Sequence, residues 1–408
     1  MTDALATIGS IIRSPDVISL VIFVMILSLF LHVKRKNVTL QKILYPLLYI
    51  MLYKTQLGLR MMDRIAKRFR GLLTIIGYCF VGFAFLGAIF MGVSIIAIMV
   101  KFFSAPSTTE TGMALVLPLT TVPGLGFIRF WHWIISIFIL AVVHEFGHGI
   151  LMRVHKVRIK SSGFGFIGIL APMMPLAFVE QDPKEMDKMD SIKQYSIFAA
   201  GPMVNIVIAI LLFSIFPFTA FGSGTPAPFE ERMTEPIGFT VNVDPNYPAG
   251  RSGLQNGTLI TNFNGEQMTE AQPFLEHMYY CVQPNETITL GNENGTYTIT
   301  TTTHPDSEKK GYIGITPPKN VRQFKPEYKK YEGTFYWFKS LLRMVALLNF
   351  FIGLANLIPI FITDGAQMFR LALRDSMKNK ALAKKIWYSI NLLFVSLIII
   401  GLTANLFK

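Results

Sequence analysis

Residues 130–152 read FWHWIISIFILAVVHEFGHGILM. About 20 apolar residues are enough for a helix to cross the hydrocarbon core of a membrane, and this stretch has the length and composition to do so. It also carries Glu145 between two histidines. A charged glutamate within a span costs on the order of 3 kcal/mol or more unless another group compensates it. We therefore predict a membrane-spanning helix that holds polar groups for a functional reason.

The whole chain has the composition of a protein that crosses the membrane several times. Of its 408 residues, 51% are hydrophobic and 15% are charged, which is too apolar for a soluble protein of this size. We expect a mainly α-helical fold with about six spans, at residues 17–33, 72–100, 130–152, 195–221, 338–362 and 386–407. Residues 40–53 are short for a span and contain Pro46, so we expect them along the membrane surface or inside the helix bundle.

The positive charge is distributed unevenly along the chain. The formal net charge is +13, and Lys and Arg number ten in residues 34–70, seven in residues 153–193 and six in residues 370–385. Cytoplasmic loops of membrane proteins carry such an excess of Lys and Arg. The pattern therefore predicts a multi-pass protein of the cell membrane, with these three loops in the cytosol and both termini outside. The net positive charge is then explained by loops that lie next to the lipid bilayer, and no nucleic-acid partner is expected.

Residues 222–337 form a polar insertion between two apolar stretches, long enough for a small domain. Short runs rich in Val, Ile, Thr and Phe alternate there with Gly, Asn and Pro, which is typical of strands and turns. Asn264-Gly265 predicts a tight hairpin turn, because both residues tolerate positive φ. Residues 272–280 predict a short helix. We therefore expect a small α+β domain on the extracytoplasmic side.

Residues 161–169, SSGFGFIGI, have the period of a strand, because glycine alternates with bulky apolar residues. They follow directly on the stretch that carries Glu145. Unpaired strand backbone is not tolerated facing lipid, so the segment has to be sheltered by protein or line a cavity. This predicts a membrane-associated β-hairpin.

The sequence also predicts a metal site. His144 and His148 are four residues apart, so on a helix they share one face and both imidazoles can reach one metal, with Glu145 beside them. Catalytic zinc sites usually take three protein ligands and leave a fourth position for water. Asp364 lies at the cytosolic end of the fifth apolar stretch, at a depth that matches Glu145. It follows Pro359, which interrupts helical hydrogen bonding, and is the candidate for the third ligand.

Several motifs in this order resemble those of the site-2 protease family, across roughly residues 130–373. They are HEFGHG at 144–149, AFVE at 177–180, AGPMVN at 200–205 and NLIPIFITDG at 356–365. The insertion resembles a PDZ domain, through VNVDPNYPA at 241–249, SGLQNGTLI at 252–260, the Asn264-Gly265 turn and GYIGI at 311–315. The sequence departs from the family pattern at Thr363 before the aspartate and at Ala366-Gln367 after it, without replacing a ligand.

The resemblance implies an intramembrane zinc metalloprotease that hydrolyses peptide bonds within or near transmembrane segments of membrane-anchored proteins. His144, His148 and Asp364 would bind Zn²⁺, and Glu145 would be the catalytic base. Zinc polarises water and stabilises developing negative charge, and Glu145 would carry the proton to the departing amine. Transmembrane protein substrates, which a first protease could already have shortened, are the implied partners.

Four further residues are candidates for substrate binding. Asn205 and Asn356 are polar residues in apolar helices, where hydrogen bonds between helices explain them equally well. The resemblance implies that they help to hold the substrate strand or the oxyanion near zinc. Gly163 and Gly165 lie in the predicted strand at 161–169, which could offer an edge for an unwound substrate to join by strand addition.

These features divide the chain into four parts. Residues 1–129 form an N-terminal membrane region with two spans and a basic loop, and residues 130–221 form a first catalytic membrane half. Residues 222–337 form the extracytoplasmic PDZ-like domain, and residues 338–408 form a second catalytic half. The active site is expected towards the cytosolic side.

Two other functions are compatible with some of these residues. In a metal-ion transporter, His144, His148 and Asp364 would form the transport site, since acids and histidines inside membranes mark ion paths. A transporter has no need of Glu145 between two ligands, nor of an attached PDZ domain. A catalytically silent membrane binding protein is the other alternative, and the intact ligands and Glu145 argue against it.

Overall fold

The computed structural model describes residues 14–44, 48–105, 111–122, 125–169, 171–216, 228–292, 295–316 and 318–404. The chain divides into two compact units. One combines Met1–Ser214 with Lys339–Lys408, and the other is Ile215–Phe338. We call them the membrane unit and the inserted unit, and each is described by itself.

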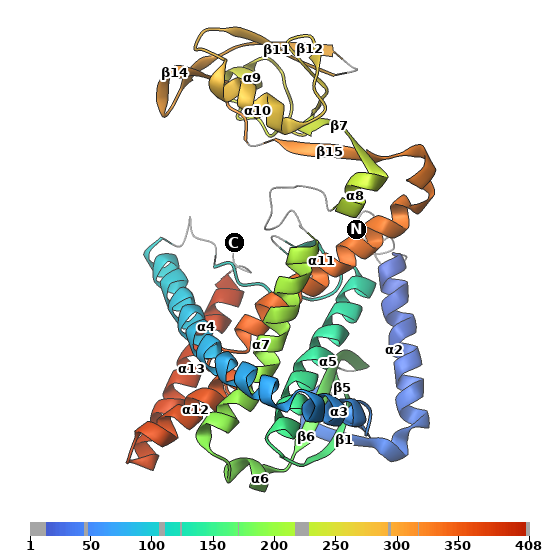
Figure 1. The fold of residues 1–408 in the computed structure, drawn as a ribbon, viewed down its shortest axis with the longest axis vertical. Helices are drawn as coiled ribbons and strands as arrows, with labels where there is room; N and C mark the ends of the chain where they lie inside the picture. The colour runs from blue at the N-terminus through green and yellow to red at the C-terminus, as the bar shows by residue number, and fades with distance from the viewer. Residues whose placement is uncertain are drawn as a thin grey trace, which may run out of the picture. The chain divides into compact units, whose positions relative to one another are not determined.

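Among the described residues, six helices are long and apolar enough to cross a membrane, which confirms the prediction of six spans. Figure 1 shows them from the blue α2 to the red α13. They are α2 (Pro15–Val33), α4 (Arg70–Ser104), α5 (Phe130–Val154), α7 (Ser191–Ile215), α11 (Glu332–Ala355) and α13 (Lys380–Ala404). Helices α2, α4 and α13 expose many large apolar side chains, as expected of surfaces that face lipid, whereas α5 exposes only two.

The fifth span is shorter than predicted at its C-terminal end. Helix α11 ends at Ala355, and a loop leads to α12 (Asp364–Ser376). Apolar residues continue through this loop, which is why the sequence suggested a longer span. Pro359 has no N–H to donate, so the loop cannot continue the helical hydrogen bonds. Of the predicted fourth span, residues 217–221 lie outside the described residues.

A four-stranded antiparallel sheet belongs to the membrane unit. Its order is β1-β2-β5-β6, and the strands are β1 (Val38–Leu44), β2 (Leu48–Thr55), β5 (Ile159–Ile169) and β6 (Ala171–Gln181). The predicted strand at 161–169 lies in β5. Of the segment 40–53, residues 40–44 belong to β1 and residues 48–53 to β2, a strand pair that was not predicted, and residues 45–47, with Pro46, lie outside the described residues. Tyr53 pairs with Phe164, more than one hundred residues away along the chain.

The alternating glycines of β5 allow close packing inside this sheet. A Cβ on Gly168 would lie 2.2 Å from the ring of Tyr49 on β2, and a Cβ on Gly165 would lie 2.3 Å from Leu176 on β6. Separations under 3 Å are not observed for real Cβ atoms, so larger residues would push neighbouring side chains apart. At Gly163 the obstacle is backbone, because a Cβ there would lie 2.1 Å from the carbonyl oxygen of Tyr53, so glycine is required at that position.

Helix α5 lies at the centre of the membrane unit. It packs against α2, α3 (Leu59–Arg68), α4 and β6, and Figure 1 shows it in teal between these elements. A buried apolar cluster that includes Met62, Leu151 and Ile197 joins it to α3 and α7. The short helix α6 (Pro183–Asp187) links β6 to α7. Strands β3 (Thr121–Val122) and β4 (Gly126–Phe127) form a small hairpin before α5.

The inserted unit contains both strands and helices. Its sheets have the orders β15-β7-β8, β10-β9-β11-β12 and β13-β14. Asn264 and Gly265 have φ of 51° and 85° and connect two antiparallel strands, which confirms the predicted turn. Phe239, Phe274 and Ile288 are buried in its core. Its elements are α8 (Pro228–Met233), β7 (Thr234–Thr240), α9 (Pro248–Arg251), β8 (Leu259–Ile260), β9 (Asn262–Phe263), β10 (Glu266–Gln267), α10 (Ala271–Tyr280), β11 (Thr287–Asn292), β12 (Gly295–Thr300), β13 (Thr302–His304), β14 (Ser307–Tyr312) and β15 (Lys319–Phe324).

Candidate metal centre

Helix α5 brings two imidazoles together. The Nε2 atoms of His144 and His148 are 3.1 Å apart, and the rings meet edge to face with centroids 4.7 Å apart. This is the geometry expected for residues four apart on one helix face. Both nitrogens therefore point at the same small volume.

The third group comes from the start of α12. Thr363 caps this helix, because its Oγ1 accepts a hydrogen bond from the N–H of Ala366 at 3.3 Å. The N–H of Gly365 donates to the carbonyl of Asn356 at 2.8 Å, which closes the loop after α11. A Cβ on Gly365 would lie 2.0 Å from the carbonyl oxygen of Leu357. The loop is therefore tight, and it fixes Asp364 at the first turn of α12.

The three side chains form a group that suits a metal ion. Asp364 Oδ2 is 3.1 Å from Nε2 of His144, and Asp364 Oδ1 is 3.4 Å from Nε2 of His148. Ligand atoms bound to one tetrahedral zinc at about 2.0–2.1 Å are roughly 3.3 Å apart. The two nitrogens are close to that separation, and with a single oxygen of Asp364 the three ligand atoms lie within 4.8 Å of one another. Two imidazoles and one carboxylate also leave a fourth position for water, as catalytic zinc requires.

The orientation of His148 is fixed by the main chain of α7. Its Nδ1 lies 2.7 Å from the carbonyl oxygen of Ile197. A carbonyl can only accept, so Nδ1 carries the proton and Nε2 keeps its lone pair towards the candidate metal position. Metal-binding histidines commonly donate their second N–H in this way. Because the partner is a backbone atom, no side-chain pattern in the sequence could have revealed it.

Asn205 lies behind His144. It is fully buried, and its Nδ2 is 3.4 Å from Nδ1 of His144. Its Oδ1 has no hydrogen-bond partner among the described residues. The two ends of an amide are assigned from the hydrogen-bond network, and exchanging them lets Oδ1 accept from a His144 Nδ1–H. That exchange gives the Oδ1 of Asn205 a donor and directs Nε2 of His144 towards the metal position, as in His148.

Gly201 allows α7 to approach the two histidines. A Cβ at this position would lie 2.3 Å from Nε2 of His148 and 2.7 Å from Nε2 of His144. Those are the two atoms that face the candidate metal position. The AGPMVN motif drew attention to Asn205, whereas the structure shows that the glycine is equally necessary to the site.

Glu145 is held by the edge of the sheet. Its Oε2 accepts a hydrogen bond from the N–H of Val179 on β6 at 3.0 Å. One carboxylate oxygen is therefore anchored to the backbone of a neighbouring strand. The sequence reading placed Glu145 beside the histidines but gave no sign of this anchor.

Strand β6 is one of the two edge strands of the sheet and β5 is not, which corrects the expectation for Gly163 and Gly165. Strand β5 pairs with β2 on one side and with β6 on the other, so neither glycine lies at an open edge. Strand neighbours cannot be read from the alternation within one segment, which explains the error. The N–H of Val179 points away from β5 to Glu145, so the free side of β6 faces the candidate metal centre.

Glu180 joins three strands of the sheet at the end of β6. Its Oε2 accepts hydrogen bonds from Ser161 Oγ at 2.6 Å and from Lys54 Nζ at 2.9 Å. These two interactions hold the pKa of Glu180 below its usual value. The carboxylate therefore stays charged and ties β2 and β5 to β6, the strand that anchors Glu145.

Comparison with known proteins points in one direction. The sequence profile described as Peptidase family M50 matches residues 132–398. An uncharacterized protein of Methanocaldococcus jannaschii is 25% identical over 344 residues, which cover 81% of this chain and 80% of that protein. This similarity extends over most of both chains but brings no function with it.

Two other relatives carry names that describe them provisionally as zinc metalloproteases. One, from Neisseria meningitidis, is 26% identical over 219 residues, or 46% of each chain. The other, from Clostridium acetobutylicum, is 23% identical over 207 residues, or 45% of this chain and 57% of that protein. The chain thus spans about half the length of these two relatives. Their names specify zinc, the metal that suits the three ligand atoms.

Proposed function

Because the chain belongs to peptidase family M50, the site-2 protease family, we propose that this zinc metalloprotease of the membrane cuts other proteins inside the bilayer. Its substrates would be membrane-anchored proteins, hydrolysed within or beside their transmembrane segments. The observation that carries the proposal is the meeting of His144, His148 and Asp364. Their ligand atoms lie within 4.8 Å of one another, and Glu145 belongs to the same helix as the two histidines.

In this proposal His144, His148 and Asp364 hold zinc, and Glu145 moves the proton. Zinc bound there supplies a Lewis acid, which polarises a carbonyl and makes water a stronger acid. The Glu145 carboxylate accepts a proton from the attacking water and returns it to the departing amine. Its hydrogen bond to the N–H of Val179 keeps the carboxylate in place. Asn205 orients His144 and does not contact the substrate.

The free edge of β6 is the proposed binding site for the unwound substrate. Successive N–H groups of a strand point to opposite sides, so Ala177 points the same way as Val179. A substrate strand could pair with the Ala177 backbone and pass the metal centre in extended form. A helical substrate hides its carbonyls in its own hydrogen bonds, and pairing with β6 would stabilise the unwound state. Gly163 and Gly165 lie in β5, which pairs with the other side of β6, so they would not contact the substrate.

The remaining assignments follow the sequence. We propose four divisions of the chain, at residues 1–129, 130–221, 222–337 and 338–408. The compact unit Ile215–Phe338 supports the third of them. The inserted unit would be a PDZ-like domain outside the cell that selects substrates and does no chemistry. Its small strand-rich core, with one ten-residue helix α10, supports this.

Metal transport is the competing function, and family membership favours hydrolysis over it. The two can be separated at Glu145, because a transport site needs the ligands but not the proton carrier. Cleavage of a membrane-spanning test substrate by the wild type, and its loss in Glu145→Gln with zinc retained, tests the proposal.

A further inference from the structure

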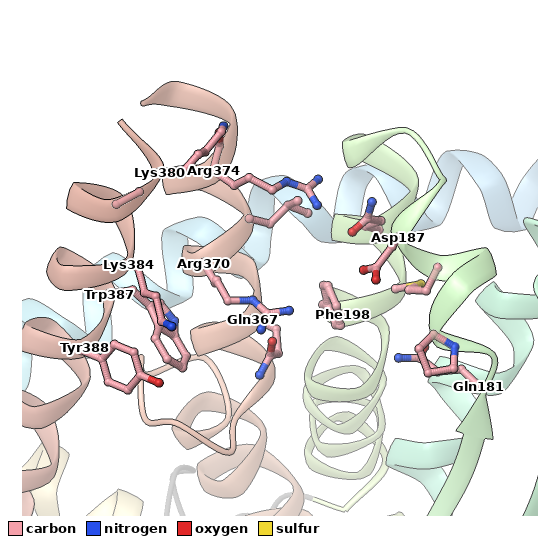
Figure 2. Close-up of a pocket in the computed structure, with 15 residues that line it drawn as sticks. Gln181, Asp187, Phe198, Gln367, Arg370, Arg374, Lys380, Lys384, Trp387 and Tyr388 are labelled. Carbon is pink, nitrogen blue, oxygen red and sulfur yellow. The ribbon is translucent and has the colours of Figure 1, made fainter. Parts of the chain in front are cut away.

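A cavity of about 890 Å³ lies beside the candidate metal centre. One wall is formed by the end of β6 with α6 and α7, and the other by α12 and α13 (Figure 2). None of the three candidate ligands lines it. Gln367, however, lies three residues after Asp364 on α12, and Phe198 follows Ile197, whose carbonyl holds His148. The cavity is therefore a neighbour of the metal centre and not a part of it.

The α12–α13 wall is strongly basic. It carries four cationic side chains, Arg370, Arg374, Lys380 and Lys384. The opposite wall contributes one carboxylate, Asp187. In Figure 2, Arg370 and Gln367 extend from α12 into the space between the two walls. A cavity lined by one sign of charge concentrates ligands of the opposite sign.

Most of this positive charge is not neutralised by the protein. Arg374 Nε pairs with its neighbour Asp375 at 3.3 Å. In the part of the chain that the structure describes, Arg370, Lys380 and Lys384 have no carboxylate within ion-pair distance. Volumes of about 300–1,000 Å³ are typical of built binding sites. Size and charge together indicate an anionic ligand.

The other wall indicates that this ligand is a polypeptide. Gln181 ends β6, the strand whose free side faces the metal centre. Its Oε1 is buried and has no hydrogen-bond partner among the described residues. The two ends of an amide are assigned from the hydrogen-bond network, so either end of this side chain could meet a ligand. What favours a polypeptide is continuity, because a substrate strand paired with β6 would run past Gln181 into the cavity.

We propose that the cavity binds the flank of the substrate that leaves the metal centre past Gln181, and that it selects flanks with acidic side chains. This inference rests on the proposed function and adds a substrate class to it. The predicted topology makes this the cytosolic flank. Most membrane proteins carry Lys and Arg there, and Arg370 with its neighbours would repel them. A site that repels the common basic flanks and attracts the rarer acidic flanks discriminates strongly between substrates.

The test uses the purified full chain in detergent and three substrates. They share one transmembrane segment and differ only in three cytosolic flank residues, which are all Asp, all Asn or all Lys. Partly exposed ion pairs contribute up to about 1 kcal/mol each, so we expect kcat/KM for the Asp flank to exceed that for the Asn flank about tenfold. The Lys flank should be the poorest substrate. The Asp preference should shrink as salt is added, because salt screens such pairs.

A charge reversal makes the test independent of folding. The double variant Arg370→Glu/Lys384→Glu should invert the order, so that the Lys flank becomes the best substrate. Loss of structure lowers all three rates and cannot invert them. The matched control is Lys378→Glu/Lys385→Glu, which makes the same charge change at exposed residues that do not line the cavity. This control should keep the wild-type order.

Fluorescence anisotropy measures the binding of the three substrates to Glu145→Gln. This measurement separates the acidic-flank proposal from the proposed protease activity on which it rests. Equal kcat/KM for the three flanks in an active wild type would overturn the inference and leave the protease intact. Ordered binding without any cleavage by the wild type would overturn the protease and leave the acidic-flank site.

A separate experiment tests whether the cavity binds a lipid headgroup instead of the substrate. The Asn-flank substrate is cleaved in vesicles of phosphatidylcholine, with or without phosphatidylglycerol. A rate that depends on phosphatidylglycerol in the wild type but not in Arg370→Glu/Lys384→Glu, with no flank preference in detergent, would identify a lipid headgroup site. That result would refute the acidic-flank proposal.

Discussion

A Cβ atom on Gly201 would lie 2.3 Å from Nε2 of His148. Helix α7 thus approaches the candidate ligand atoms of α5 too closely to leave room for a side chain at this position. Any larger residue at this position has to displace an imidazole or move one helix away from the other. The candidate zinc site therefore depends on the absence of a side chain at Gly201 as well as on the two histidines.

Gly201→Ala should accordingly lose zinc without unfolding the protein. We expect zinc measured by mass spectrometry to fall well below one equivalent per chain, with helical circular dichroism unchanged. The control is Gly82→Ala on α4, where a Cβ meets nothing within 4 Å, and where alanine favours a helix by about 0.5–1 kcal/mol. One equivalent of zinc and full activity in Gly201→Ala would show that the close approach is not needed.

A second prediction concerns the free edge of β6. Ala177→Pro removes an N–H that points away from β5, and proline is tolerated at such edge positions. One hydrogen bond is worth about 1 kcal/mol, so kcat/KM for a membrane-spanning substrate should fall about fivefold or more. Zinc content should not change. Ala177→Val keeps the N–H and serves as the control. If both variants cleave equally well, the substrate does not pair with this edge.

The topology can be tested with a natural cysteine. Cys281 is exposed and belongs to the inserted unit, which we predict to lie outside. A membrane-impermeant maleimide should therefore label it in intact cells. In a Cys281→Ser background, Lys378→Cys in the third basic loop should react only after permeabilisation. The reverse pattern of labelling would place the basic loops outside and refute the predicted orientation.

The inserted unit can be removed with little disturbance. Thr234 and Phe324 pair across β7 and β15, so residues 235–323 can be replaced by a short Gly/Ser linker. Hydrolysis of a short membrane peptide should stay close to wild type, because the candidate ligands and Glu145 are in the other unit. Discrimination between full-length and trimmed substrates should weaken. Loss of peptide hydrolysis in a folded, zinc-loaded deletion would assign the unit to the catalytic machinery.

The sequence was informative where the signal is local and periodic. Residues four apart on a helix share a face, so His144 and His148 could be predicted to meet. The length of the apolar stretches predicted six spans, and the described residues contain six helices that are long and apolar enough to cross a membrane. The end of α11 at Ala355 was missed because the loop after it remains apolar. Pro359 marked the break, but composition alone favoured a longer span.

Contacts between distant segments could not be predicted. The pairing of Tyr53 with Phe164 makes β5 an inner strand, and nothing in either segment names the other as its partner. The anchors of His148 and Glu145, at Ile197 and Val179, are backbone atoms. Every residue has such a carbonyl and nearly every residue such an N–H. Only the fold determines which of them reach the site.

The most direct test compares zinc content and proteolysis in the same preparations of wild type, Glu145→Gln and Glu180→Gln. Glutamine at 145 keeps the size of the side chain but cannot take the proton. General base catalysis contributes about 100-fold or more, so we expect Glu145→Gln to keep one zinc per chain and lose at least that factor in cleavage of a membrane-spanning substrate. Glu180→Gln changes the carboxylate next to Val179. This carboxylate ties β2 and β5 to β6 but, among the described residues, forms no hydrogen bond or ion pair with Glu145 or the candidate ligands, so the variant should cleave far faster than Glu145→Gln. Cleavage by Glu145→Gln at the wild-type rate, with zinc in place, would contradict the account.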